Sequence, residues 1–191
     1  MKASERILEY MPWRVRCCRH GDRHQQIVER WQLGEWLPIL ISAEGDGDQD
    51  WPPSPPLQQL VLDELHDSLP VLLGVGMAGS AHWSLSLHVD PATQYLISDN
   101  ACRSDNYPDA LGSSFQLGKG ISAILADDAK CIQFSNCDGT ICQLETNESC
   151  QLHVETDSIR IEPILSMNTP SPRAGAKGVT YRWKFTLSDA Q

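Results

Sequence analysis

The stretch that most restricts the fold is residues 82–103, HWSLSLHVDPATQYLISDNACR. Its first half alternates apolar with polar residues, the period-two pattern of a strand with one apolar and one polar face. The apolar members of this alternation are Trp83, Leu85, Leu87 and Val89. Residues 90–93, Asp-Pro-Ala-Thr, supply turn chemistry, and an extended run resumes after them. The segment is therefore predicted to form a β-hairpin.

Similar short runs recur along most of the chain. Strands are predicted at residues 13–17, 27–31, 71–75, 114–117, 129–134, 141–144, 150–154, 159–162 and 179–187. Asp138-Gly139 is a strong hairpin signal between two of them. The fold class that this pattern predicts is mainly β (α+β at the margin), an antiparallel β-sandwich or β-barrel of short strands and hairpins with one or two covering helices. Sandwich and barrel need the same alternation and differ only in closure, so both remain open.

Two segments favour helix instead. In residues 4–11, Ser4 is a suitable N-cap for a short helix. Ser54-Pro55 has the same character, and the leucines and valine that follow recur at helical spacing. These apolar residues are Leu57, Leu60, Val61 and Leu65. Helix also competes with strand over residues 23–32, since Gln, Glu and Arg favour it.

Composition divides the chain into three parts. Residues 1–41 are expected to form a basic N-terminal segment with a short helix and strands. Residues 42–56 carry four acids and four prolines and are expected to form an acidic surface loop or linker, without the ligand spacing of an EF-hand. Residues 57–191 are expected to form a helix plus an antiparallel β domain, with the first part packed on it as one domain. A second long loop is expected at residues 167–177.

Charge and hydropathy exclude several partners. The net charge is −10, and because residues 1–30 carry +3 the remainder of the chain carries −13. An acidic body repels phosphate backbones, so nucleic acid is not an expected partner. The longest apolar run, residues 71–81, is too short to span a membrane, and no signal peptide is evident, so a soluble, cytoplasmic protein is expected. The odd number of cysteines, seven, argues against a disulfide framework.

Two glycine-rich segments resemble cofactor motifs without meeting their requirements. Gly74, Gly76 and Gly79 match a dinucleotide-binding pattern, but the sequence that follows is strand-like where the pyrophosphate site needs a helix. These glycines are expected to make a bend, a bulge or a close backbone approach. Residues 112–120 have the wrong spacing for a P-loop. No cofactor is predicted.

The weak candidates for a metal site are Cys17, His20 and His24. Cys17 and Cys18 are adjacent and therefore point to opposite faces of a strand, so at most one of them can join the two histidines. No metal is predicted here, and Cys17 is expected to be buried beside Trp13 and Val15.

The candidate ligand-binding residues are His82, Ser84, Ser86, His88, Asp99, Asn100 and Arg103. The first four form the polar face of the predicted hairpin, which either faces water or lines the cavity of a closed barrel. Asp99 and Arg103 either pair with each other to cap the hairpin or contribute to binding.

Three hypotheses about function follow. The first is a β-rich binding module without an intact catalytic motif, which binds a small amphipathic ligand or a protein partner. The second is an enzyme with a site around His82, His88, Asp99 and Arg103, groups suited to act as base, acid and anion clamp. The third is a structural or assembly protein. The sequence predicts no oligomeric state.

Overall fold

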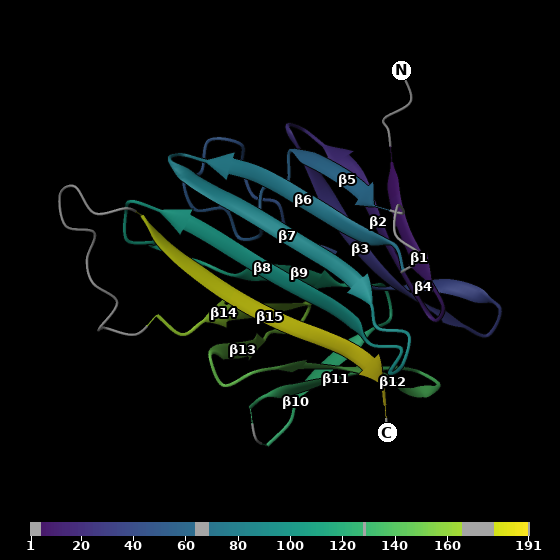
Figure 1. The fold of residues 1–191 in the computed structure, drawn as a ribbon. Helices are drawn as coiled ribbons and strands as arrows, with labels where there is room; N and C mark the ends of the chain where they lie inside the picture. The colour runs from purple at the N-terminus through teal and green to yellow at the C-terminus, as the bar shows by residue number, and fades with distance from the viewer. Residues whose placement is uncertain (1–4, 64–68, 128, 166–177, 191) are drawn as a thin grey trace.

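The computed structural model describes residues 5–63, 69–127, 129–165 and 178–190. Over these residues the chain is all-β, with fifteen strands and no helix (Figure 1). The strands are β1 (Arg6–Tyr10), β2 (Trp13–His20), β3 (Arg23–Gln32), β4 (Glu35–Ser42), β5 (Gln59–Asp63), β6 (Val71–Ala78), β7 (Ala81–Val89), β8 (Leu96–Ser104), β9 (Ser113–Leu117), β10 (Ser122–Leu125), β11 (Cys131–Asn136), β12 (Gly139–Thr146), β13 (Cys150–Val154), β14 (Ser158–Pro163) and β15 (Val179–Asp189). Within the described ranges no helix has the length and apolar character needed to cross a membrane.

The strands form two antiparallel sheets. Sheet A has the order β1-β2-β3-β4-β9-β14-β13, and sheet B has the order β10-β11-β12-β15-β8-β7-β6-β5. Figure 1 shows β5 to β8 and β15 as one layer, with β9, β13 and β14 in the layer behind it. The edge strands of each sheet pair with a single neighbour, so the sheets do not close on themselves. The closed-barrel alternative is therefore wrong, and the prediction of antiparallel strands is confirmed.

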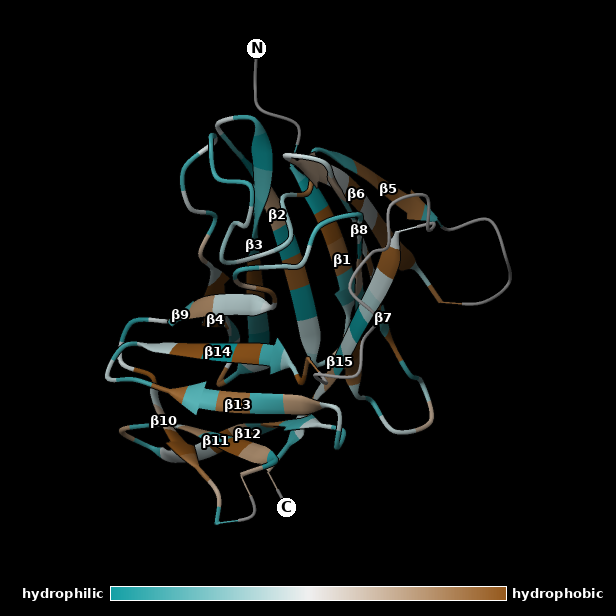
Figure 2. Cartoon of the chain, turned by 90° about the vertical axis from the view of Figure 1, so that its left-hand side faces the viewer, coloured by the Kyte–Doolittle hydropathy of each residue, from teal (hydrophilic) through white to brown (hydrophobic). Residues whose placement is uncertain are grey.

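The hairpins predicted from alternation are present. Residues 82–103 fall in β7 and β8, which pair antiparallel from His82 and Arg103 to Val89 and Leu96. The Asp138 turn joins β11 to β12, and β13 pairs with β14. Figure 2 shows hydrophobic and hydrophilic residues alternating along the longer strands. The loop expected at residues 167–177 lies outside the described residues. β15 begins at Val179.

Where the structure describes the segments predicted to be helical, they form strands or extended chain. Within residues 4–11 the described chain forms β1, whose Leu8 faces the core while Ile7 is exposed. In the segment that follows Ser54-Pro55, Gln59–Asp63 forms the edge strand β5, which pairs with Val71–Val75 of β6. Leu65 lies outside the described residues. In residues 23–32, where helix competed with the predicted strand, the strand is confirmed as β3, between β2 and β4. In each case pairing with a neighbouring strand satisfies the backbone groups and overrides a local helical preference.

The core lies between the two sheets and is rich in tryptophan. Trp83 of β7 and Trp183 of β15 pack edge to face with ring centroids 5.9 Å apart. The Trp183 Nε1 donates a hydrogen bond of 2.9 Å to Ser113 Oγ, which links sheet B to β9 of sheet A. Phe115 and Phe185 make a second edge-to-face contact across the sheets, at 5.9 Å. Aromatic pairs of this geometry add about 0.5–1.5 kcal/mol beyond the area that they bury.

The segment 42–56 connects the sheets and is only partly a surface loop. Asp46 to Asp50 are exposed, as expected, but Pro52 and Ser54 to Leu57 are buried. The backbone of this buried half runs against β6: a Cβ built on Gly76 would lie 1.7 Å from the Pro56 carbonyl oxygen. The close backbone approach expected of the glycine motif is thus confirmed at Gly76. Gly79 has a φ of +52° in the turn between β6 and β7, where a helix would be needed for a dinucleotide.

Candidate functional site

The outer face of sheet B, which points away from the core, carries the candidate site. On β7 the side chains of His82 and Ser84 are exposed and those of Ser86 and His88 are half-buried, whereas the apolar residues between them are buried. The face therefore borders solvent and does not line the interior of a barrel. Of the two interpretations of this polar face, the structure supports the one in which the face borders water.

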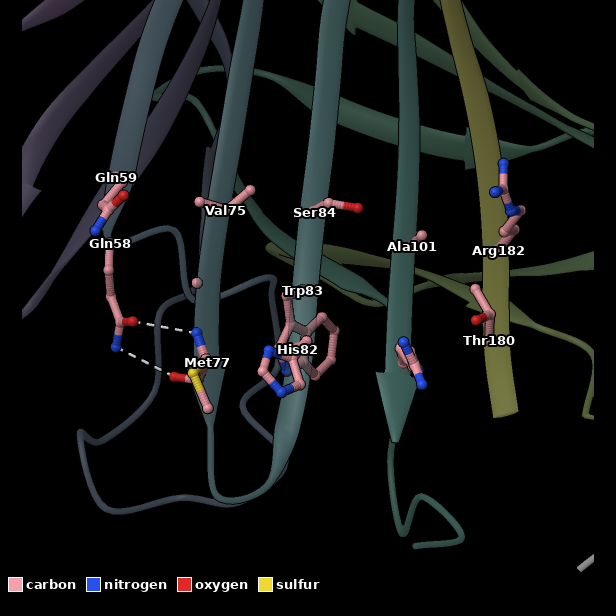
Figure 3. A pocket seen from close by; sticks show the side chains of 12 residues that line it. Gln58, Gln59, Val75, Met77, His82, Trp83, Ser84, Ala101, Thr180 and Arg182 are labelled. Carbon is pink, nitrogen blue, oxygen red and sulfur yellow. Dashed lines mark hydrogen bonds between the residues drawn. The ribbon is translucent and has the colours of Figure 1, made fainter. Parts of the chain in front are cut away.

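Strand pairing places the outward side chains in rows across the sheet. The first row contains Met77, His82, Arg103 and Thr180, and the second contains Gln59, Val75, Ser84, Ala101 and Arg182. Figure 3 shows the labelled members of these rows on one side of adjacent strands. Directly opposed residues in an antiparallel pair have Cβ atoms about 4.5–5.5 Å apart, so neighbours within a row are in reach of one another.

A groove of about 530 Å³ runs across these two rows. Its residues come from β5 to β8, from β15 and from Gln58, which precedes β5. A second hollow, of about 390 Å³, adjoins it and is lined by Ser80, His82, Arg103, Ser104 and Asp105. His82 and Arg103 border both hollows, so this cross-strand pair lies at the centre of the candidate site.

One side of the groove is apolar. Val61 of β5 and Leu73, Val75 and Met77 of β6 are between 41% and 60% exposed. Val61 pairs with Leu73, and the three β6 residues alternate along one face of their strand, so together they form a continuous surface. We call these four residues the apolar strip. Val75 and Met77 line the groove, and Leu73 and Val61 continue the strip beyond it. Large apolar side chains gathered in this way on a protein surface typically mark a binding site.

The opposite side of the groove is cationic. Arg103 of β8 and Arg182 of β15 are exposed, and within the described residues neither forms an ion pair. Five other arginines do pair with acids: Arg14, Arg16, Arg23, Arg30 and Arg160. The two groove guanidiniums thus retain their hydrogen-bond donors for solvent or for a ligand.

At the β5 end of the groove, the side chain of Gln58 makes the backbone hydrogen bonds that a neighbouring strand would make. The Gln58 amide donates from Nε2 to the Met77 carbonyl and accepts from the Met77 backbone N–H, both at 3.1 Å (Figure 3). The Gln58 backbone N–H also donates to the Val75 carbonyl, at 2.9 Å. These bonds satisfy the edge of β6 beyond the end of β5 and fix the backbone that carries Val75 and Met77.

The second group of predicted residues is divided between the two faces of β8. Asp99 and Arg103 point outward, whereas Asn100 is buried and donates from Nδ2 to Ser98 Oγ at 3.0 Å. Asp99 lies opposite Ser86 and is separated from Arg103 by Ala101 on the same face. The ion pair that we expected between Asp99 and Arg103 is not formed, because residues four apart on a strand are roughly 13 Å apart.

The weak metal candidates do not form a common site. Cys17 is buried, and this burial raises the pKa of its thiol to about 12. His20 is exposed at the end of β2, while His24 is buried with Nδ1 3.1 Å from the Leu57 carbonyl oxygen. In the part of the chain that the structure describes, no three His, Cys, Asp or Glu side chains are placed to hold a metal ion.

Of the twelve groove residues, sequence reasoning identified only His82, Ser84 and Arg103. Val75, Met77, Thr180 and Arg182 were not among the candidates, although Thr180 and Arg182 belong to the polar face of the predicted strand 179–187. The alternation in residues 179–187 shows which side chains share a face. It does not show which strands lie next to this one, because that depends on strand pairing. β15 follows β14 in sequence yet inserts between β12 and β8.

No protein-family model matches this chain, and no match was found among the curated proteins.

Proposed function

We propose that this protein is a β-sandwich binding module that takes a small amphipathic ligand in the groove on the outer face of sheet B. The observation that carries the proposal is that Val75 and Met77 of the apolar strip line one groove together with hydrogen-bonding side chains. A ligand with an apolar and a polar part can cover both sides together. The groove volume of about 530 Å³ is within the range of small-molecule sites, roughly 300–1,000 Å³.

The energetics favour a ligand with an apolar portion. Val61, Leu73, Val75 and Met77 leave apolar surface in water beside the polar side chains of the same sheet face. Removing such surface from water is favourable by about 25 cal/mol per Å². Ser84, Thr180 and Gln59 supply orientation from both sides of the groove, since their hydroxyl and amide groups act as donors or acceptors.

An enzyme built on His82, His88, Asp99 and Arg103 has less support. His82 and His88 are six residues apart on β7, roughly 20 Å at about 3.3 Å per residue. Asp99 lies two rows from the His82–Arg103 pair. An acid and base that act on one substrate must both lie within hydrogen-bond reach of it, and these four groups do not converge on one point.

Calorimetric titration with an uncharged alkyl glycoside, which carries a ten-carbon chain and is kept below its micelle concentration, tests the proposal. The double variant Val75→Thr/Met77→Thr keeps strand-compatible residues and removes apolar contact area. We expect it to weaken binding roughly tenfold, since each buried methylene is worth about 0.8 kcal/mol.

Ile124→Thr is the matched control, because Ile124 is an exposed strand residue on β10, outside the groove. It should bind like the parent protein. Failure of the parent protein to bind the glycoside, or equal binding by the double variant, would reject the proposed site.

A further inference from the structure

The cationic side of the groove indicates which polar group the ligand carries. We infer that the ligand is an amphipathic carboxylate, whose carboxylate is held by Arg103 and Arg182 while its apolar part lies on Val75 and Met77. This inference rests on the function proposed above and adds the chemical class of the ligand.

The register of β8 and β15 makes the two arginines neighbours on the sheet. Arg103 lies opposite Thr180, and Arg182 lies opposite Ala101, so the arginines are diagonal neighbours on one face. Diagonal residues in an antiparallel pair are about 7–8 Å apart, within reach of long side chains. Ala101, with its short side chain, leaves space between them. A single carboxylate can therefore accept hydrogen bonds from both guanidiniums.

Neither guanidinium is neutralised by an acid in the part of the chain that the structure describes. In a protein of net charge −10, five arginines pair with acids, whereas Arg103 and Arg182, like Arg6 and Arg19, form no ion pair within the described residues. A planar guanidinium matches the geometry of a carboxylate and binds it through two parallel hydrogen bonds. Ser84 and Thr180 add hydroxyl donors on the same surface.

Strand spacing fixes the size of the ligand. Arg103 is on β8 and Met77 is on β6, with β7 between them. Two strand spacings of about 4.8 Å put the carboxylate roughly 10 Å from the apolar part of the site. The ligand then lies across the strands, and a short carboxylate such as acetate cannot reach both sides.

The test compares ten-carbon chains that differ in the head group: decanoate, the uncharged decyl glycoside and decyltrimethylammonium, with acetate as the short carboxylate. We expect decanoate to bind at least tenfold more tightly than the other three. Long-range attraction to an acidic protein would instead favour the cation, so this order reports the local site. Decanoate affinity should fall as salt concentration rises.

The double variant Arg103→Gln/Arg182→Gln should lose at least tenfold in decanoate affinity, or 1.4 kcal/mol, and keep its affinity for the glycoside, which shows that it is folded. Lys119→Gln/Lys184→Gln removes the same charge from exposed positions outside the groove lining and should bind decanoate like the parent.

Decanoate binding no tighter than that of the glycoside or the cation, or unchanged in the arginine variant, would overturn the carboxylate inference alone. Binding of neither decanoate nor glycoside would remove the proposed function as well.

Discussion

His82 of β7 and Arg103 of β8 are direct cross-strand partners on the outer face of sheet B, and both border the two hollows of the candidate site. Their position is a product of register: a slip of one residue between β7 and β8 would turn one of them into the core. The buried Trp83 and Cys102, which pair with each other on the inner face, oppose such a slip. The packing of the core therefore positions the candidate site.

The buried carboxyl of Glu44 should make stability depend on pH. Glu44 is 4% exposed, its Oε1 accepts a hydrogen bond from Ser42 Oγ, and Oε2 has no partner among the described residues. Burial raises the pKa of this carboxyl to about 7. The folded state holds the proton more tightly than the unfolded state, so the free energy of unfolding falls as pH rises from 4.5 to about 7.

The variant Glu44→Gln removes this titration. Relative to the parent, its free energy of unfolding should increase by about 3 kcal/mol between pH 4.5 and 8, as measured by urea denaturation at a series of pH values. Asp48→Asn, at an exposed position in the same loop, is the charge control. A pH-independent difference between Glu44→Gln and the parent would contradict the account.

A second carboxylate, that of Glu29, should contribute more to stability than a surface ion pair. Glu29 is 2% exposed, and its Oε2 accepts hydrogen bonds from Arg14 Nε at 2.5 Å and Arg16 Nε at 2.9 Å. We expect Glu29→Gln to lower the free energy of unfolding by about 1–3 kcal/mol, because hydrogen bonds to a charged group are lost in a buried place.

Glu162 provides the comparison, since it pairs with Arg160 and His153 on the surface of sheet A. Glu162→Gln should cost less than about 1 kcal/mol in the same urea titration. Equal losses in the two variants would show that burial does not decide the contribution of Glu29.

The close approach of Pro56 to β6 should make Gly76 intolerant of any side chain. Because a Cβ would lie 1.7 Å from the Pro56 carbonyl oxygen, Gly76→Ala must displace the 42–56 segment or β6. We expect a loss of more than about 3 kcal/mol in thermal or urea unfolding. Gly47→Ala, where a Cβ would have no atom within 4 Å, should change stability by less than about 0.5 kcal/mol. Tolerance of alanine at Gly76 would show that the two backbones are not in contact.

The seven thiols should differ in reactivity according to burial. Burial raises the pKa of Cys17, Cys102 and Cys142 to about 12, whereas Cys137 is exposed in the turn between β11 and β12. Because the thiolate is the reactive form, iodoacetamide should label Cys137 first and these three only on unfolding. Peptide mass mapping after a short exposure measures this order. Early labelling of Cys142 in the folded protein would contradict the structure.

The alternation of apolar and polar residues was enough to predict most of the strands, the hairpin of residues 82–103 and its polar face, but not β4 or β10. It was not enough to predict β5, since Leu57, Leu60 and Val61 recur at helical spacing. The strand forms because residues 59–63 pair with β6. Asp99 and Asn100 were both taken as candidate ligand-binding residues. Adjacent strand residues face opposite sides, and Asn100 is buried. Arg182 joins Arg103 only through the pairing of β15 with β8, a long-range contact that local sequence does not encode.

The most direct test of the central claim is to map the binding of the uncharged decyl glycoside by changes in backbone amide chemical shifts. The account predicts the largest changes on β6, β7, β8 and β15 around Met77, His82, Arg103 and Thr180, and small changes on β10 to β12. Changes concentrated elsewhere, or none at all, would contradict the assignment of this face as the binding site.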